Sequence, residues 1–252
     1  MGSEALFGLE GRVALVTGAS SGLGRAAATF LAQAGARVVG LARRADSLEQ
    51  WCAETDGQTA SLAADLAAGA DIAAIAARSA EPFGPPEILV NAAGLNLRQP
   101  ADQVTPDGWE RTIALNLTVP FFLAQALVPG MREKNWGRII NFASLQSRRA
   151  FTNGIAYGAS KGGVEQMTRA MAEAWSRDGI NANALAPGFF PTELTGPVFA
   201  DPSVAAMHAA STCIGRNGKM VDIEGPLLFL ASEASVYVTG QVLFVDGGYT
   251  AK

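Results

Sequence analysis

A glycine-rich turn between an apolar run and a helix-forming stretch limits the folds open to this chain more than any other feature. The apolar run covers residues 12–16, and Thr17-Gly18-Ala19-Ser20-Ser21-Gly22-Leu23-Gly24 follows it directly. Residues 25–34 are rich in helix formers and are closed by Gly35, and a second apolar run follows at 37–41. This order predicts a strand, a tight turn, a helix and a parallel strand, the repeating unit of an α/β sheet.

The same alternation continues along the chain. Further apolar runs of strand length occur at 59–63, 88–90, 137–143, 180–185 and 242–245. Helix-forming stretches occur at 70–80, 106–131, 155–177 and 221–231. We therefore expect one α/β domain over residues 1–252, a doubly wound, Rossmann-like parallel sheet of seven strands with helices on both faces.

Residues 189–215 interrupt the alternation. This segment contains three prolines and scattered apolar side chains, and an irregular stretch of that length inside a domain is usually a functional lid or disordered. We expect a substrate lid there. The apolar side chains expected to close over a ligand are Phe189, Phe190, Leu194, Val198, Phe199 and Met207.

Composition narrows the function classes. Of the 252 residues, 49% are apolar and 17% charged, and the net charge of −4 gives no reason to expect nucleic acid or an anionic membrane surface as a partner. Cys52 and Cys213 form no C-x-x-C motif, which favours a reducing compartment. The first residues lack the features of a signal peptide or a myristoylation site, and no window has the ~18 uninterrupted apolar residues of a membrane span. We expect a soluble cytoplasmic protein.

Metal and hydrolase chemistry are poorly supplied. His208 is the only histidine, no G-x-S-x-G motif accompanies it, and no metal site is predicted. This histidine is either a general base that reaches a reaction centre or a helix-face residue in a mobile segment.

The glycine-rich turn is a candidate nucleotide site. Glycines allow backbone N–H groups to approach a pyrophosphate at the start of the next helix. A turn that merely packs helix on strand is the alternative. The spacing Gly18-x-x-x-Gly22-x-Gly24 differs from the usual G-x-G-x-x-G of dinucleotide sites.

The end of the second strand bears on the choice of nucleotide. A carboxylate there accepts the ribose 2′-hydroxyl of NAD, whereas a cation accommodates the 2′-phosphate of NADP. Here Arg43 and Arg44 follow the strand, with no carboxylate before Asp46. Two guanidinium groups can grip a phosphate, which favours NADP(H) over NAD(H), unless they simply open a solvated helix.

A second candidate for chemistry lies at 144–161. Tyr157 and Lys161 are four residues apart and share one face of the expected helix, and Ser144 follows the strand 137–143. A hydroxyl facing a Tyr/Lys pair can polarise and protonate a carbonyl group. A surface tyrosine beside a solvated lysine is the alternative, because Y-x-x-x-K is a short and common pattern.

Other polar residues also lie at strand ends or inside helices. Asp65 either contacts an adenine amino group or caps the next helix. Asn116, inside an apolar helix, is either a buried, hydrogen-bonded kink or an exposed residue. The small residues Asn91-Ala92-Ala93-Gly94 would let a cofactor ring lie close to the backbone.

In order along nearly the whole chain, these motifs resemble the short-chain dehydrogenase/reductase family. The matching pieces are residues 17–24, Asp65, residues 91–94, Asn116, Ser144, Tyr157 with Lys161, and Asn183 with Pro187-Gly188. One departure is Ala92, where the family usually has a second Asn. The resemblance implies an oxidoreductase that interconverts a ketone and a secondary alcohol, and a homotetramer.

The resemblance also implies residue roles. Tyr157 would be the general acid or base, and Lys161 would lower its pKa and hold the nicotinamide ribose. Ser144 would orient the carbonyl group, Asn116 would hold a water in a proton relay, and Thr192 would contact the nicotinamide carboxamide. The expected cofactor-binding residues are Gly18, Ser20, Ser21, Gly22, Leu23, Gly24, Arg43, Arg44, Asp65, Leu66, Asn91, Ala92, Ala93, Gly94, Tyr157, Lys161, Pro187, Gly188, Phe190 and Thr192.

Local patches bear on the substrate. Residues 96–98, 144–147, 187–195 and 240–248 are similar to the gluconate 5-dehydrogenase (5-ketogluconate reductase) branch of the family. That similarity implies a sugar acid or polyol, and the expected substrate residues are Arg98, Gln146 and Arg148. The branch tends to carry an acid where this chain has Arg148 and Arg149, so Arg148 either meets the substrate carboxylate or is a solvated cation.

Two other functions share these features. A 3-oxoacyl thioester (acyl-carrier-protein) reductase would use the same catalytic residues. A non-catalytic NADP-binding sensor or scaffold protein would use the nucleotide site alone.

Overall fold

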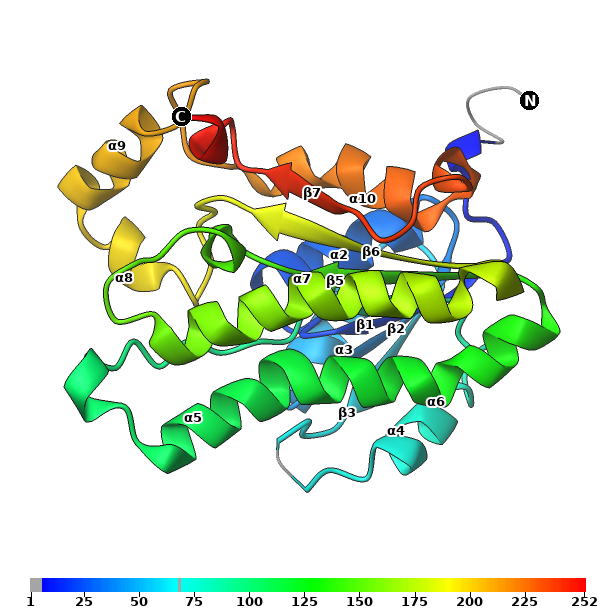
Figure 1. Ribbon diagram of the computed structural model, residues 1–252. Coiled ribbons are helices and arrows are strands. Elements are labelled where there is room, and N and C mark those ends of the chain that lie inside the picture. The colour runs from blue at the N-terminus through cyan, green and yellow to red at the C-terminus, as the bar shows by residue number, and fades with distance from the viewer. Residues whose placement is uncertain (1–5, 68) are drawn as a thin grey trace.

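Seven parallel strands form one sheet in the order β3-β2-β1-β4-β5-β6-β7 (Figure 1). The computed structural model describes residues 6–67 and 69–252, so the N-terminal residues in which no signal peptide is predicted lie outside the described part. The strands are β1 (Val13–Thr17), β2 (Arg37–Ala42), β3 (Thr59–Ala63), β4 (Ile88–Asn91), β5 (Gly137–Phe142), β6 (Ile180–Pro187) and β7 (Val242–Val245). The predicted fold class is confirmed.

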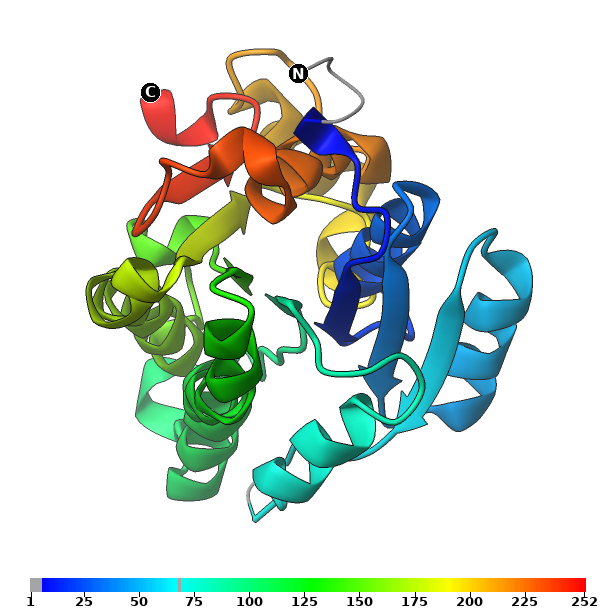
Figure 2. The same ribbon diagram turned by 90° about the vertical axis from the view of Figure 1, so that its right-hand side faces the viewer.

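Helices cover both faces of the sheet, as the turned view shows (Figure 2). Alternate residues of the central strands enter two separate cores: Ala14 and Val16 pack on one face, and Leu15 packs on the other. The first face is covered by α2 (Gly22–Gln33), α3 (Ala45–Glu54) and α10 (Glu224–Ala231). The second is covered by α4 (Ile72–Ser79), α6 (Val119–Glu133) and α7 (Ile155–Trp175), and α5 (Pro106–Ile113) leads into α6.

The predicted helix over 106–131 is interrupted. Residues 114–118 form a π-helical turn between α5 and α6, and this turn contains Asn116. Together α5, the π turn and α6 (Pro106–Glu133) are long and apolar enough, by length and composition, to cross a membrane. A core helix of a globular protein passes the same test, and here Leu123, Leu127 and Met131 are buried against the sheet.

The segment 189–215 is more ordered than the sequence suggested. It contains two short helices, α8 (Gly196–Phe199) and α9 (Pro202–Ala210), beyond the carboxyl ends of the strands at the left of Figure 1. Pro197 and Pro202 lie in the first turns of these helices, where proline is favoured because no N–H is needed there. Two of the three prolines that pointed to an irregular stretch therefore begin helices instead.

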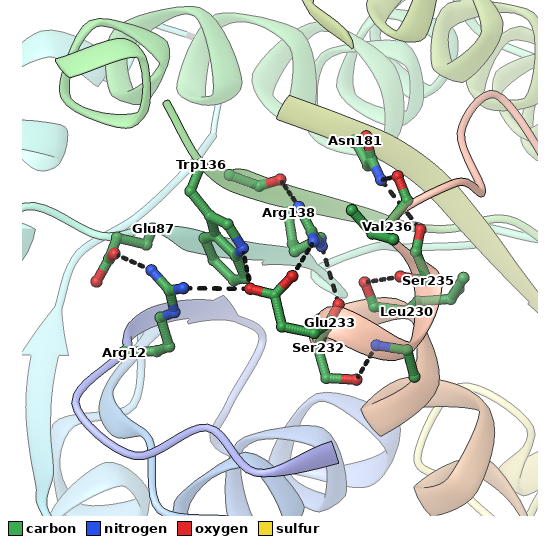
Figure 3. Close-up of polar contacts among 12 residues, drawn as sticks. Arg12, Glu87, Trp136, Arg138, Asn181, Leu230, Ser232, Glu233, Ser235 and Val236 are labelled. Atoms are coloured by element: carbon green, nitrogen blue, oxygen red, sulfur yellow. Dashed lines mark hydrogen bonds and ion pairs between the residues drawn. The ribbon is translucent and has the colours of Figure 1, made fainter. Parts of the chain in front are cut away.

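A polar cluster ties the amino ends of the strands together (Figure 3). The Trp136 ring lies between the guanidinium groups of Arg12 and Arg138, at 3.6 and 4.3 Å from the ring centroid. Arg12 Nη1 donates to Glu87 Oε1 at 2.7 Å, and Trp136 Nε1 donates to Glu233 Oε1 at 2.7 Å. This cluster joins β1, β4, β5 and the end of α10 at the edge of the sheet opposite the cavity described next.

Candidate active site

A cavity of about 820 Å³ lies at the carboxyl ends of β1 to β6. It includes the point between β1 and β4 where the strand order reverses, the usual ligand site of an open α/β sheet. Most of the predicted cofactor residues line it: Gly18, Ser20, Ser21, Gly22, Leu23, Gly24, Arg43, Arg44, Leu66, Ala92, Ala93, Gly94, Tyr157, Lys161, Pro187, Gly188, Phe190 and Thr192.

The glycine-rich turn forms a close-packed cradle along this cavity. A Cβ atom on Gly24 would lie 2.4 Å from the Gly18 carbonyl oxygen, so only glycine fits there. Thr17 Oγ1 accepts hydrogen bonds from the N–H groups of Ala92 and Ala93, at 3.1 and 3.0 Å, which holds the two loops side by side. Ser21 precedes α2 without a side-chain capping bond, so the first N–H groups of the helix are available to an anionic ligand.

Ser144, Tyr157 and Lys161 meet at the inner end of the cavity. Tyr157 and Lys161 come from adjacent turns of α7 and are both buried, and the Lys161 ammonium lies 5.7 Å from the centroid of the Tyr157 ring. Lys161 Nζ donates to the Phe142 carbonyl oxygen at 2.6 Å. The predicted proximity of the three side chains is thus present, and the alternative of a surface tyrosine beside a solvated lysine is wrong.

Burial changes the acidity of both groups. Desolvation raises the pKa of the Tyr157 hydroxyl, while its hydrogen bond with Ser144 and the charge of Arg98 act in the opposite direction. Desolvation also lowers the pKa of Lys161 to about 8. Tyr157 is therefore a protonated, buried acid at neutral pH, and Lys161 is a cation close to its titration point.

Asn116 is buried and fully hydrogen-bonded. Its Nδ2 donates to the Leu95 carbonyl oxygen at 2.9 Å and to Ser160 Oγ at 3.0 Å, and its Oδ1 accepts from the Leu95 N–H at 2.9 Å. Asn116 does not line the cavity. Of the two sequence interpretations, the buried and bonded kink is the one the structure contains.

The exposed Arg44 side chain folds back onto the glycine-rich turn. Its Nη2 donates to Ser21 Oγ at 2.8 Å and to Ser20 Oγ at 3.1 Å. Its guanidinium also forms an ion pair with Glu193, with Arg44 Nη1 at 2.9 Å from Glu193 Oε1. Arg43 is exposed and lines the cavity as well.

Asp65 and Asn91 lie outside the cavity lining. Asp65 Oδ1 accepts from the Ala67 N–H at 3.0 Å and closes a turn, while the following helix α4 is capped by Asp71. Asn91 is buried, and its Nδ2 donates to Asn141 Oδ1 at 2.9 Å. Asp65 therefore does not cap α4, and the sequence neighbours Leu66 and Ala92, rather than Asp65 and Asn91, line the cavity.

The three predicted substrate residues separate in space. Arg98 and Gln146 line the cavity, and Arg98 Nη2 donates to the Leu194 carbonyl oxygen at 3.1 Å. Arg148 is not among the lining residues: it forms an ion pair with Glu165 at 2.8 Å and lies over the Phe244 ring. Arg149 Nη2 donates to the Thr250 carbonyl oxygen. Arg148 therefore does not lie in the cavity, and it is paired with Glu165 instead of being a lone solvated cation.

His208, which the sequence left open as a general base or a helix-face residue, lines the cavity. It lies on α9, is only 8% exposed, and its ring stacks on Phe189 with centroids 3.7 Å apart. Burial lowers its pKa, so the ring is neutral at pH 7. Phe189, Phe190, Leu194, Val198 and Met207 also line the cavity, as predicted, whereas Phe199 does not. The sequence signal for this position is that the only histidine lies in the segment 189–215, which also contains Phe189, Phe190 and Phe199.

Among residues 6–67 and 69–252, no group of three or more His, Cys, Asp or Glu side chains is arranged to hold a metal ion.

A Rossmann-like sheet with a glycine-rich cradle and a Ser–Tyr–Lys trio beside it defines a class of nucleotide-dependent oxidoreductases. Residues 18–250 match the family model described as Enoyl-(Acyl carrier protein) reductase. The chain belongs to the short-chain dehydrogenase/reductase family and is an oxidoreductase acting on CH–OH groups.

The similar proteins include gluconate, threitol and galactitol dehydrogenases. The chain is 40% identical over 249 residues to the gluconate 5-dehydrogenase of Gluconobacter oxydans (strain 621H), covering 97% of each chain. It is 40% identical to the 2-dehydro-3-deoxy-D-gluconate 5-dehydrogenase of Escherichia coli (strain K12), covering 98% of each. A solved gluconate 5-dehydrogenase from Burkholderia cenocepacia J2315, in complex with NADP and tartrate, is 37% identical, with a TM-score of 0.93 and full coverage of both chains. The chain is therefore a gluconate 5-dehydrogenase-like oxidoreductase of this family.

Proposed function

We propose that this protein is an NADP(H)-dependent dehydrogenase/reductase that interconverts a ketone and a secondary alcohol on a sugar acid or polyol, such as 5-ketogluconate and gluconate. The observation that carries the proposal is the buried Ser144–Tyr157–Lys161 trio at the inner end of a cavity lined by a glycine-rich cradle. The relatives named above support a sugar-acid substrate.

The cofactor site is proposed from the cavity lining. The turn of Gly18, Gly22 and Gly24 and the uncapped start of α2 would hold the pyrophosphate, because they line the cavity and the helix start has free N–H donors. Arg44, with Arg43 beside it, would bind the 2′-phosphate. When bound, the nicotinamide supplies the hydride; the other steps belong to side chains of this chain.

Proton transfer falls to Tyr157. In reduction, its buried hydroxyl donates a proton to the carbonyl oxygen, and burial keeps that proton in place at neutral pH until the oxygen becomes basic. Lys161 stabilises the resulting phenolate by its charge, and Ser144 orients the oxygen by a hydrogen bond. Asn116, through its bonds to Leu95 and Ser160, holds the segment after β4 against α7.

Substrate recognition is proposed for the side of the cavity formed by the lid, residues 189–215. Arg98 supplies a cation for a carboxylate, and Gln146 supplies an amide for hydroxyl groups. The neutral ring of His208, fixed on Phe189, adds a polar edge to an otherwise aromatic wall. A polar sugar chain with one carboxylate matches this lining better than a long acyl chain does.

We also propose a cytoplasmic homotetramer. Trp109 and Phe122 on the α5–α6 stretch and Leu243 on β7 are exposed apolar side chains on the elements that form tetramers in this family. Light scattering coupled to gel filtration tests the mass in solution, and a monomer would reject this assembly.

A panel of turnover assays tests the function. NADPH oxidation is followed with 5-ketogluconate, small neutral ketones and β-keto thioesters, and we expect rapid turnover with 5-ketogluconate. The Tyr157→Phe variant should lower kcat by about 10²- to 10⁴-fold with little change in cofactor binding. Activity confined to thioesters would favour the acyl-carrier-protein reductase alternative, and cofactor binding without turnover of any substrate would favour the sensor alternative.

A further inference from the structure

The Arg44 guanidinium, the proposed partner of the 2′-phosphate, is already occupied by a carboxylate. Both oxygens of Glu193 accept hydrogen bonds from it: Nη1 donates to Oε1 at 2.9 Å and Nη2 donates to Oε2 at 3.1 Å. Arg44 Nη2 also donates a hydrogen bond to Ser21 Oγ at 2.8 Å. This two-oxygen arrangement is the one in which arginine binds a phosphate group.

Glu193 reaches Arg44 from the other side of the cavity. Arg44 follows β2, whereas Glu193 lies 149 residues later, in the segment after β6 that begins the lid. Its neighbour Thr192 packs on the glycine-rich turn, since a Cβ atom on Gly22 would come within 3.2 Å of the Thr192 side chain. Arg44 and Glu193 line both the cavity of the Ser–Tyr–Lys trio and a second hollow beside it, so their ion pair forms part of the wall between the two.

We propose that Glu193 is a specificity-determining residue that competes with the cofactor's 2′-phosphate for Arg44 and thereby weakens the preference for NADPH over NADH. This inference rests on the proposed cofactor site. A 2′-phosphate that binds Arg44 must break the ion pair or accept a carboxylate next to its own negative charge, and both cost affinity. The 2′-hydroxyl of NADH carries no charge and meets no such competition.

The exposure of the ion pair makes exchange feasible. The side chains of Arg44 and Glu193 are 49% and 65% exposed, and exposed ion pairs contribute little net stability. A doubly charged phosphate can therefore displace the carboxylate, with Glu193 lowering the affinity rather than preventing binding. The hydrogen bond from Arg44 lowers the pKa of Glu193, so the competitor is ionised throughout the neutral range.

The test compares binding of NADPH and NADH without substrate. Dissociation constants are measured by fluorescence titration for the wild type and for Glu193→Gln, which keeps the shape and removes the charge. We expect NADPH to bind about three- to tenfold more tightly to the variant, with NADH changed by less than about twofold. In an Arg44→Ala background the same substitution should improve NADPH affinity by less than it does in the wild type, because competition for the shared partner is gone and only the repulsion by the Glu193 charge is relieved.

A remote ion pair provides the matched control. Arg132 and Asp178 form an exposed pair at 2.6 Å outside the cavity lining, so Asp178→Asn should alter neither dissociation constant. Raising the salt concentration should shrink the difference between wild type and Glu193→Gln. An unchanged NADPH to NADH ratio in Glu193→Gln, with wild-type turnover of 5-ketogluconate intact, would overturn this inference alone. A wild type that binds neither nucleotide would overturn the proposed function with it.

Discussion

At the scale of single residues, the buried ammonium group of Lys161 lowers the stability of the folded protein. Lys161 is 5% exposed, and in the described part of the chain no carboxylate forms an ion pair with it. Among the described residues, it donates a hydrogen bond to the Phe142 carbonyl oxygen. A buried, unpaired cation destabilises the folded state, so Lys161 does not serve stability, which agrees with the role proposed for it beside Tyr157.

The Lys161→Met variant separates these two effects. The pKa of Lys161 falls from 10.5 to about 8 on folding, so between those values the unfolded chain binds more protons and wild-type stability rises with pH. The cost is fully present below pH 8. We expect the variant to be more stable than wild type at pH 7 by on the order of 1–3 kcal/mol, with the gap closing between pH 8 and 10.5. Urea unfolding across pH 7–10.5 measures the gap.

Two results would contradict this expectation: a less stable variant at pH 7, or a gap that does not depend on pH. Ketone reduction should be lost in the variant in either case. Gly163→Ala is unsuitable as a neighbouring control, because its new Cβ would come within 2.8 Å of Leu117. Gln166→Met, an exposed position on the same helix, should change neither stability nor its pH dependence.

At the scale of elements, local sequence patterns predict the strands, which depend on residues close together in the chain. They do not predict features that depend on contacts between distant residues. The seven strands follow from buried apolar runs, and each lies within one or two residues of its predicted position. The π turn at 114–118 depends on Asn116 bonding to Leu95 and Ser160, contacts 21 and 44 residues away, and no local pattern reports them. The sequence does not predict the helices α8 and α9, because proline is typical both of helix breaks and of first helical turns, and Pro197 and Pro202 occupy first turns here.

The cap of α9 gives a test of the lid as an element. Asp201 Oδ1 accepts from the N–H groups of Ser203 and Val204, at 2.9 and 3.4 Å, and α9 carries His208 to the cavity. Asp201→Ala should therefore loosen α9, lowering amide hydrogen-exchange protection in residues 204–210 by about three- to tenfold and raising KM for the sugar acid more than it lowers kcat.

Asp71 offers the matched control for that experiment. It caps α4 in the same way, accepting from the Ala74 N–H at 3.0 Å, but lies outside the cavity lining. Asp71→Ala should lower protection in α4 and leave KM unchanged. Equal effects of both substitutions on KM would show that the lid has no special part in substrate binding.

At the scale of the whole molecule, the two ends of the strands differ. The carboxyl ends carry the glycine-rich turn, the Ser–Tyr–Lys trio and the proposed lid, and motifs in the sequence predict most of these features. The amino edge has the cluster of Arg12, Glu87, Trp136, Arg138 and Glu233 (Figure 3). Its members come from four separate places in the chain and form no motif, so sequence patterns could not reveal it.

Glu87 is the buried carboxylate of that cluster and the place to test the division. It is 3% exposed and forms ion pairs with Arg12 at 2.7 Å and Lys134 at 3.3 Å. Both cations are partly exposed and Arg12 keeps its contact with Glu233, so Glu87→Gln should destabilise the fold by about 1–2 kcal/mol. Asp107→Asn, which breaks the exposed 3.5 Å pair with Arg111, should cost less than about 0.5 kcal/mol.

The kinetic constants of Glu87→Gln test whether the polar cluster at the amino ends of the strands affects the cavity at their carboxyl ends. Since the cluster lies at the opposite ends of the strands from the cavity, the folded variant should keep the wild-type kcat and the wild-type KM for both NADPH and 5-ketogluconate. The assay is run at a temperature where urea and thermal unfolding show the variant to be folded. An altered KM for NADPH under those conditions would mean that strain at the amino edge passes along β1 and β4 to the cradle, because these two strands connect Glu87 and Arg12 to the turn at 17–24 and the loop at 91–94.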